Sequence, residues 1–192
     1  MVWGTKADQR QTWDEGGRRL PVTVVKTFPM TVTQVKTTTT DGYQAIQFGF
    51  GRKKGQFKRE MRVDDVGEFK LGTTITATQV LSPGDVVKVS GVSRGKGFGG
   101  VVKRWGFKGG PKTHGQSDRL RAPGSIGQGT DPGRVHKGKH MPGRLGGKRV
   151  TVRNLTVLKV EESGEVWVSG QVPGSRRNLV AITRLRKDRN ES

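Results

Sequence analysis

Six residues, Gly95 to Gly100, carry the G-x-G-x-x-G spacing of dinucleotide-binding loops and follow a predicted strand. In such loops a helix begins directly after the glycines, and its N-terminus binds the pyrophosphate. Residues 101–111 are interrupted by glycine and end in proline, so we expect no helix of useful length there. We interpret the loop instead as a place where backbone N–H groups approach phosphates, while Lys96, Lys103 and Arg104 supply positive charge.

Two histidines, His136 and His140, have the i, i+4 spacing of metal ligands. That spacing brings two imidazoles together only on a helix, and Gly138 and Pro142 disfavour one. No neighbouring glutamate completes a catalytic pattern. We therefore predict no metal site, and we expect these histidines to stack on RNA or to form hydrogen bonds with it.

Ser117 and Ser125 lie near histidines, which is the raw material of a hydrolytic triad. Neither serine stands in the G-x-S-x-G turn that exposes a nucleophile, and only two acidic residues, Asp118 and Asp131, lie nearby. The chain contains no cysteine, which excludes disulfides, thiolate zinc sites and a cysteine nucleophile. We predict that the protein is not an enzyme, with no catalytic residue, no cofactor and no small-molecule substrate.

The net charge of +20, from 36 Lys and Arg against 16 Asp and Glu, requires a polyanionic partner. A membrane surface would need an amphipathic helix or a lipidation signal, and the sequence shows neither. No apolar run is long enough to span a bilayer, and the first ten residues lack the apolar core of a secretory signal. We therefore expect nucleic acid as the partner and no membrane.

The charge is concentrated in residues 94–150, which hold 14 Lys and Arg against two acids and 16 of the 30 glycines. An irregular basic segment suits the crevices of folded RNA better than a regular DNA groove. The predicted RNA-binding residues of this segment are its cations, its histidines, Trp105 and two polar residues: Arg94, Lys96, Lys103, Arg104, Trp105, Lys108, Lys112, His114, Arg119, Arg121, Ser125, Gln128, Arg134, His136, Lys137, Lys139, His140, Arg144, Lys148 and Arg149. A second basic run predicts RNA contacts at Arg52, Lys53 and Lys54, with a solvated loop as the alternative.

The aromatic residues of the segment, Phe98, Trp105 and Phe107, alternate with cations and leave two interpretations open. They either cap the core of the protein or stack on bases. Trp167 stands in a strand pattern, so we expect it in the core.

The elements that must position these residues are β-strands. Short β-branched runs separated by turns predict a mainly β fold, with a β-barrel body interrupted by a long, irregular, basic, glycine-rich extension. The expected strands cover residues 22–28, 32–37, 44–50, 73–79, 86–92, 149–160, 165–172 and 179–183.

The predicted domains are a body (residues 1–93 and 149–185), an extension (residues 94–148) and a polar tail (residues 186–192). The extension has too few apolar side chains to offset its ordering entropy, about 1–2 kcal/mol per residue, so we expect its order to depend on a partner.

Long stretches resemble the universal L-three family of the large ribosomal subunit, in its bacterial form. The resemblance covers nearly the whole chain and is densest in residues 90–107, Ser-Gly-Val-Ser-Arg-Gly-Lys-Gly-Phe-Gly-Gly-Val-Val-Lys-Arg-Trp-Gly-Phe. Further stretches are residues 20–25, 32–36, 41–47, 113–115, 121–128, 132–143 and 149–152.

The resemblance implies a β-barrel body on the subunit surface and an extension that enters the large-subunit rRNA towards the peptidyl transferase centre, with residues 124–132 as its inner tip. It implies early binding in assembly, neighbouring ribosomal proteins as partners, no catalysis, and a cytoplasmic ribosome, with an organellar ribosome left open. Two departures are Thr130, where family members carry a methylated glutamine, and Asp8-Gln-Arg10, which leaves the structure of residues 1–16 unassigned. The rival interpretations are a free RNA chaperone or nucleic-acid-binding protein, and a nucleotide enzyme that uses the glycine loop.

Overall fold

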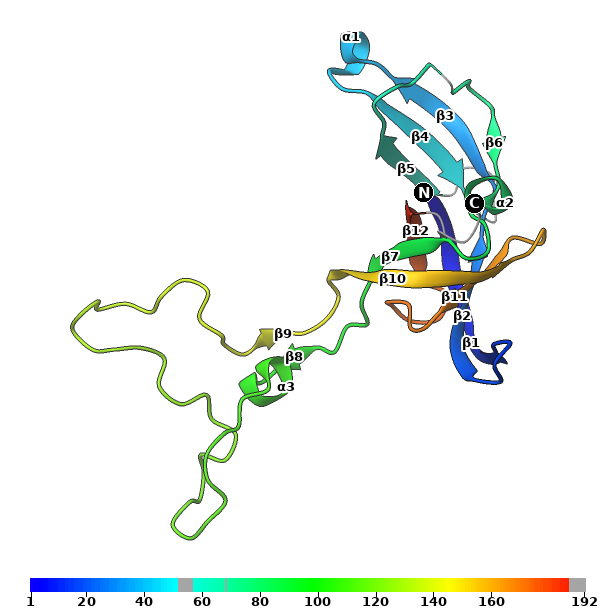
Figure 1. Ribbon diagram of the computed structural model, residues 1–192. Coiled ribbons are helices and arrows are strands. Elements are labelled where there is room, and N and C mark those ends of the chain that lie inside the picture. The colour runs from blue at the N-terminus through cyan, green and yellow to red at the C-terminus, as the bar shows by residue number, and fades with distance from the viewer. Residues whose placement is uncertain (52–56, 68, 187–192) are drawn as a thin grey trace. The chain divides into compact units, whose positions relative to one another are not determined.

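The computed structural model describes residues 1–51, 57–67 and 69–186. The chain divides into two compact units (Figure 1). One, the body, contains Met1–Ser93 and Arg149–Ser192, and the other, the extension, is Arg94–Lys148. The predicted RNA contacts at Arg52, Lys53 and Lys54 lie outside the described residues, as do residues 187–192 of the predicted tail.

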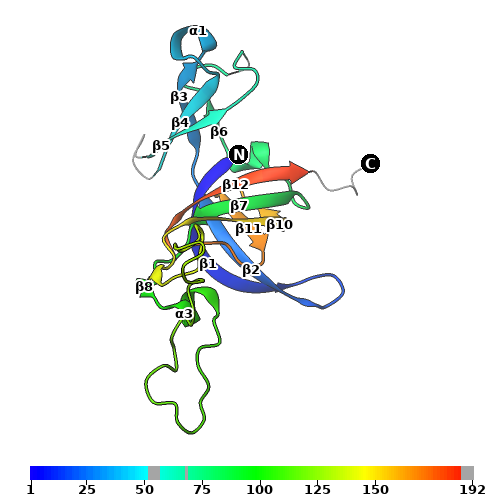
Figure 2. The same cartoon turned by 90° about the vertical axis from the view of Figure 1, so that its left-hand side faces the viewer.

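Six antiparallel strands of the body form one closed sheet in the order β1-β12-β7-β10-β11-β2. The sheet closes because β2 pairs with both β11 and β1. Figure 2 shows the β1–β2 hairpin extending past the other strands. The six strands are β1 (Val2–Trp13), β2 (Arg19–Thr27), β7 (Val86–Val92), β10 (Arg149–Val160), β11 (Glu165–Ser169) and β12 (Leu179–Arg186).

A second sheet of the body has four strands in the order β5-β4-β3-β6 and lies beside the closed sheet (Figures 1 and 2). Its strands are β3 (Met30–Lys36), β4 (Ala45–Phe50), β5 (Phe57–Arg62) and β6 (Thr74–Ile75). Two four-residue helices, α1 (Thr38–Asp41) and α2 (Ala77–Val80), connect strands of the body. None of the helices within the described ranges is both long enough and apolar enough to cross a membrane.

The hydrophobic core of the body includes residues of both sheets. Trp3 of the closed sheet stacks on Phe50 of β4, with ring centroids 5.2 Å apart, and lies 5.7 Å from Phe48. Alternating valines of the closed sheet, such as Val87 and Val89 of β7, are fully buried. The alternation follows from the period of two along a strand, which turns every second side chain inward.

The prediction of a mainly β fold is confirmed. The expected hairpin before and after Asp41-Gly42 is present as β3 and β4, and the turn at 162–164 joins β10 to β11. Residues 1–16, for which the sequence assigned no structure, contain the 12-residue strand β1.

Four details of the sequence prediction are wrong. The strand expected over residues 73–79 is only two residues long, and α2 follows it. The helix begins there because the Gln79 side chain accepts a hydrogen bond from the Thr76 N–H (3.0 Å) in a capping box. The strand predicted over 165–172 ends at Ser169, and β12 continues to Arg186, the first residue of the predicted tail. Trp167 is half-buried and lies on the opposite face of β11 from buried Val166 and Val168, so it is not in the core.

Candidate nucleic-acid interface

The extension starts and ends in a short paired segment, which we call the root (residues 94–105 and 140–148). Two-residue strands β8 (Phe98–Gly99) and β9 (Gly143–Arg144) pair antiparallel there. The backbone N–H of Lys96 donates to the Leu145 carbonyl (2.9 Å), and the N–H of Leu145 donates to the Gly97 carbonyl (2.8 Å). The extension, expected to be irregular, thus contains one short pair of strands at its root.

A five-residue helix, α3 (Val101–Trp105), follows the glycine loop directly. Gly100 precedes it in an extended conformation, and the Gly106 N–H closes it on the Val102 carbonyl at 3.0 Å. A helix of this length is less than two turns long. It provides little of the aligned peptide dipole on which a dinucleotide site depends.

Trp105 connects the two sides of the root. Its ring stacks on His140 with centroids 3.8 Å apart and an interplanar angle of 1°. Its indole Nε1 donates to the Met141 carbonyl (2.9 Å), and the Arg104 guanidinium donates to the same oxygen (2.6 Å). The guanidinium also lies 4.9 Å from the centroid of the Trp105 ring.

These contacts decide one of the open interpretations of the aromatic residues. Trp105 is 42% exposed and Phe98 is 78% exposed, and neither belongs to the hydrophobic core cluster. Capping of the core is therefore wrong for both residues. His140 covers Trp105 within the protein, while Phe98 offers an open aromatic side chain.

Sequence reasoning missed Met141. Its contribution comes from a backbone carbonyl that accepts from two side chains, and no side-chain pattern in a sequence marks such an acceptor. His140, one of the two histidines with metal-ligand spacing, stacks on Trp105. Within the described ranges, no group of three His, Cys, Asp or Glu side chains is arranged to hold a metal ion.

Between α3 and β9 the chain runs through two long loops, residues 106–139 (Figure 1). The chain folds back on itself where Gly110 donates its N–H to the Leu120 carbonyl (3.0 Å). A Cβ at Gly110 would lie 2.7 Å from the Arg119 carbonyl oxygen, so only glycine permits this approach. A hollow of about 590 Å³ lies in the same region, with Phe107, Lys108 and Gln116 in its wall.

The predicted RNA-binding side chains between residues 94 and 149 are exposed, apart from half-buried Arg104. The extension holds 13 Lys and Arg and only two acids, Asp118 and Asp131. Most of these cations therefore have no carboxylate partner within their own unit. The surface of the extension is a dense display of positive charge on a backbone rich in glycine.

The body pairs more of its charges internally. Lys36 of β3 donates to Glu60 of β5 (2.8 Å) and to the Tyr43 hydroxyl (2.9 Å), and Tyr43 donates to Glu60 (2.9 Å). The hydrogen bond from Lys36, followed by that from Tyr43, lowers the pKa of Glu60 below its usual value. Charges of the body thus contribute to its own sheet, in contrast to those of the extension.

Comparison with known proteins gives one consistent result. A family model described as ribosomal protein L3 matches residues 48–173. The chain is 47% identical to the large ribosomal subunit protein uL3 of Dehalococcoides mccartyi strain CBDB1, covering 97% of this chain and 98% of the relative. It is 43% identical to uL3 of Herpetosiphon aurantiacus, covering 97% and 96%, and 42% identical to uL3 of Chlorobaculum tepidum, covering 97% and 99%.

Proposed function

Because the chain belongs to the ribosomal protein L3 family, we propose that it binds the rRNA of the large ribosomal subunit directly, through the extension. Members of this family are structural constituents of the large subunit and not enzymes, and the chain is located in the cytoplasmic ribosome. The finer proposal concerns which part of the chain meets the RNA and how.

The proposal rests on one observation. The extension contains 13 Lys and Arg but only two acidic residues, and nearly all of these cations are exposed. Such a surface repels itself unless phosphates neutralise it. Each neutralised phosphate releases condensed counterions, which makes binding favourable and strongly dependent on salt. The charge supports the loops and the root as one RNA-binding surface on the extension.

The backbone of the extension supports the same proposal. Its glycines remove side-chain bulk, so that backbone N–H groups can approach phosphates closely. Loops of irregular course suit single-stranded bulges and junctions, where RNA exposes base edges. We place residues 124–132 at the innermost position, near the peptidyl transferase region, which the extension would support without taking part in the chemistry.

The body has a different role in this proposal. The closed sheet serves as a β-barrel platform that holds the two ends of the extension together, since Val92 and Arg149 are paired neighbours on β7 and β10. Its surface faces neighbouring ribosomal proteins. Early association during assembly follows from the extension, which must enter the rRNA before the surrounding RNA has closed.

A salt titration of binding to large-subunit rRNA tests the proposal. Lys137→Ala with Lys139→Ala should reduce the slope of log affinity against log salt by about 1–2. A matched double variant of exposed lysines in the body, Lys26→Ala with Lys70→Ala, should leave the slope nearly unchanged. Equal effects of the two double variants would contradict a binding surface on the extension.

The position of the inner tip needs a second experiment. Since the chain has no cysteine, Ser125→Cys provides a unique attachment point for a photoreactive group. In reconstituted large subunits, its adducts should map to rRNA of the peptidyl transferase region. Adducts elsewhere in the rRNA would leave RNA binding intact and refute the placement of the tip.

A further inference from the structure

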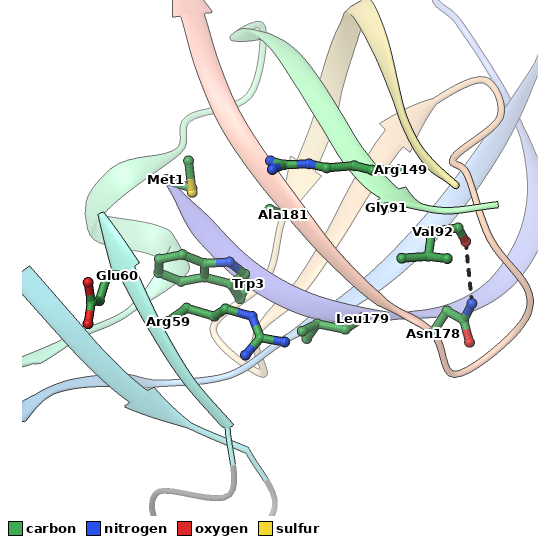
Figure 3. Close-up of a pocket in the computed structure, with 10 residues that line it drawn as sticks. All are labelled: Met1, Trp3, Arg59, Glu60, Gly91, Val92, Arg149, Asn178, Leu179 and Ala181. Carbon is green, nitrogen blue, oxygen red and sulfur yellow. Dashed lines mark hydrogen bonds between the residues drawn. The ribbon is translucent and has the colours of Figure 1, made fainter. Parts of the chain in front are cut away.

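A second candidate RNA site lies entirely within the body. A pocket of about 520 Å³ opens between the closed sheet and β5 of the second sheet (Figure 3). Its volume falls within the ~300–1,000 Å³ range of pockets that enclose small ligands. Of its residues, the sequence marked Arg149 as an RNA contact and placed Arg59 at the end of the second basic run, residues 52–59.

The floor of the pocket is apolar. Trp3 is only 5% exposed and is held rigidly by its stack on Phe50. Leu179 and Ala181 of β12 continue this surface (Figure 3). Val92, at the end of β7, is 49% exposed, which leaves an uncovered apolar edge at the rim. The floor could receive a flat, weakly polar group such as a nucleobase.

Two arginines from different elements border this floor. Arg59 comes from β5 and Arg149 from the first position of β10, and Figure 3 shows their side chains on either side of the floor residues. One acid, Glu60, also lines the pocket, but it binds Lys36 at 2.8 Å and its carboxylate points away from both guanidinium groups (Figure 3). The charge that faces the pocket is therefore positive.

The combination of an apolar floor and two guanidinium groups matches one ligand chemistry. A guanidinium donates two parallel hydrogen bonds to a phosphate, and arginine is preferred where a phosphate must be oriented. Unpaired RNA bases leave their stack and rest on apolar or aromatic surfaces. We propose that this pocket binds one unstacked nucleotide of the large-subunit rRNA, with its phosphate between Arg59 and Arg149 and its base on the apolar surface of Val92, Leu179 and Ala181.

This inference rests on the proposed rRNA binding but assigns it a second, separate site. The extension displays many cations along irregular loops, and contacts of such cations with phosphates carry little sequence information. A pocket with a fixed floor can recognise a single extruded base. The body would thereby fix the register of the protein on the rRNA, while the extension supplies most of the charge.

The test uses the full chain with a photoreactive group on Val92→Cys, again the single cysteine. In reconstituted large subunits, the adduct should map to one rRNA nucleotide. Arg59→Ala with Arg149→Ala should abolish that adduct and weaken rRNA binding by roughly 10- to 100-fold, because each guanidinium loses charged hydrogen bonds to phosphate. Arg153→Ala, an exposed arginine on the same strand as Arg149, should preserve the adduct and change affinity by less than about threefold.

The outcomes separate the two proposals. If the unmodified chain does not bind rRNA, the proposed function fails. If it binds rRNA but the double arginine variant binds as tightly as Arg153→Ala, only the pocket proposal fails. An adduct on a neighbouring ribosomal protein, or one spread over many nucleotides, also overturns the pocket proposal. A circular dichroism spectrum and thermal midpoint matching the unmodified chain ensure that the double variant is folded.

Discussion

Replacing Trp105 with alanine should loosen the root of the extension without affecting the body. The substitution removes a ring stack on His140, a hydrogen bond to the Met141 carbonyl and the contact with the Arg104 guanidinium. These contribute about 0.5–1.5, 0.5–1.5 and 0.5–1 kcal/mol in general. Because Trp105 is 42% exposed, we take the low end of each range and expect a loss of about 1.5 kcal/mol.

Hydrogen exchange measures this loss directly. The amides of Lys96 and Leu145 donate across the root and exchange only when it opens. A loss of about 1.5 kcal/mol should lower their protection about 12-fold. His140→Ala, which removes the stack and leaves both hydrogen bonds to Met141, should give a smaller loss, and His140→Phe should retain most of the protection.

A tryptophan of the body provides the control. Trp13 is 60% exposed at the end of β1, so Trp13→Ala removes the same side chain from the other unit. Trp13→Ala should leave the exchange protection of the Lys96 and Leu145 amides unchanged. The reasoning is refuted if Trp105→Ala leaves these two amides as protected as before, or if it lowers protection equally in β7 and β10.

Three further outcomes follow from the structure. In the same exchange experiment, Gly146→Ala should lower the protection of the root amides more than Gly147→Ala does. Both glycines have positive φ, but only a Cβ at Gly146 would collide with the Arg94 carbonyl. Equal losses of protection would contradict this close approach. Phe48→Ala should lower the free energy of unfolding in urea by about 3–5 kcal/mol, because Phe48 is buried in the core. Phe98→Ala should lower it by less than about 0.5 kcal/mol, because Phe98 is 78% exposed. Similar losses for the two variants would show that the core is misassigned. The hydrogen bond from Lys36 lowers the pKa of Glu60, so the stability that this pair contributes is present above the unfolded-state pKa and is lost as the pH falls through the lowered folded-state pKa. Glu60→Gln should therefore lower the urea midpoint at pH 7, and this difference should shrink steadily as the pH is lowered below 4.5, while Glu162→Gln changes the midpoint little. A difference that does not depend on pH would exclude the ionised Glu60–Lys36 pair as its source.

Local patterns predicted the strands of the body well where alternation and turns coincide. The β3–β4 and β10–β11 hairpins follow from β-branched runs on either side of Asp41-Gly42 and Glu162-Ser-Gly164. The exceptions have physical causes. Thr73–Gln79 has the composition of a strand, but the Gln79 side chain satisfies the Thr76 N–H and begins a helix instead. β1 was not predicted because its many polar residues lack the apolar alternation of a strand. It is stabilised instead by pairing with both β2 and β12.

The candidate site was predictable in charge and unpredictable in geometry. Counting Lys and Arg separated residues 94–148 from the rest, because charge density is a property of composition. The stack of Trp105 on His140 joins residues 35 positions apart through a root that contains only two-residue strands. The pocket around Trp3 is lined by residues of β1, β5, β7, β10 and β12. A local sequence pattern cannot predict that these distant segments lie next to one another.

The most direct measurement compares the unmodified chain with a variant in which a short Gly-Ser linker replaces residues 94–148. Val92 and Arg149 are paired neighbours, so the linker can join β7 to β10 without disturbing the closed sheet. Affinity for large-subunit rRNA would be measured from 50 to 200 mM salt. We predict that the unmodified chain loses about 10³–10⁵ in affinity over this range and that the linker variant binds weakly with a much shallower slope. A linker variant that keeps both the affinity and the slope would contradict the central claim that the extension binds the rRNA.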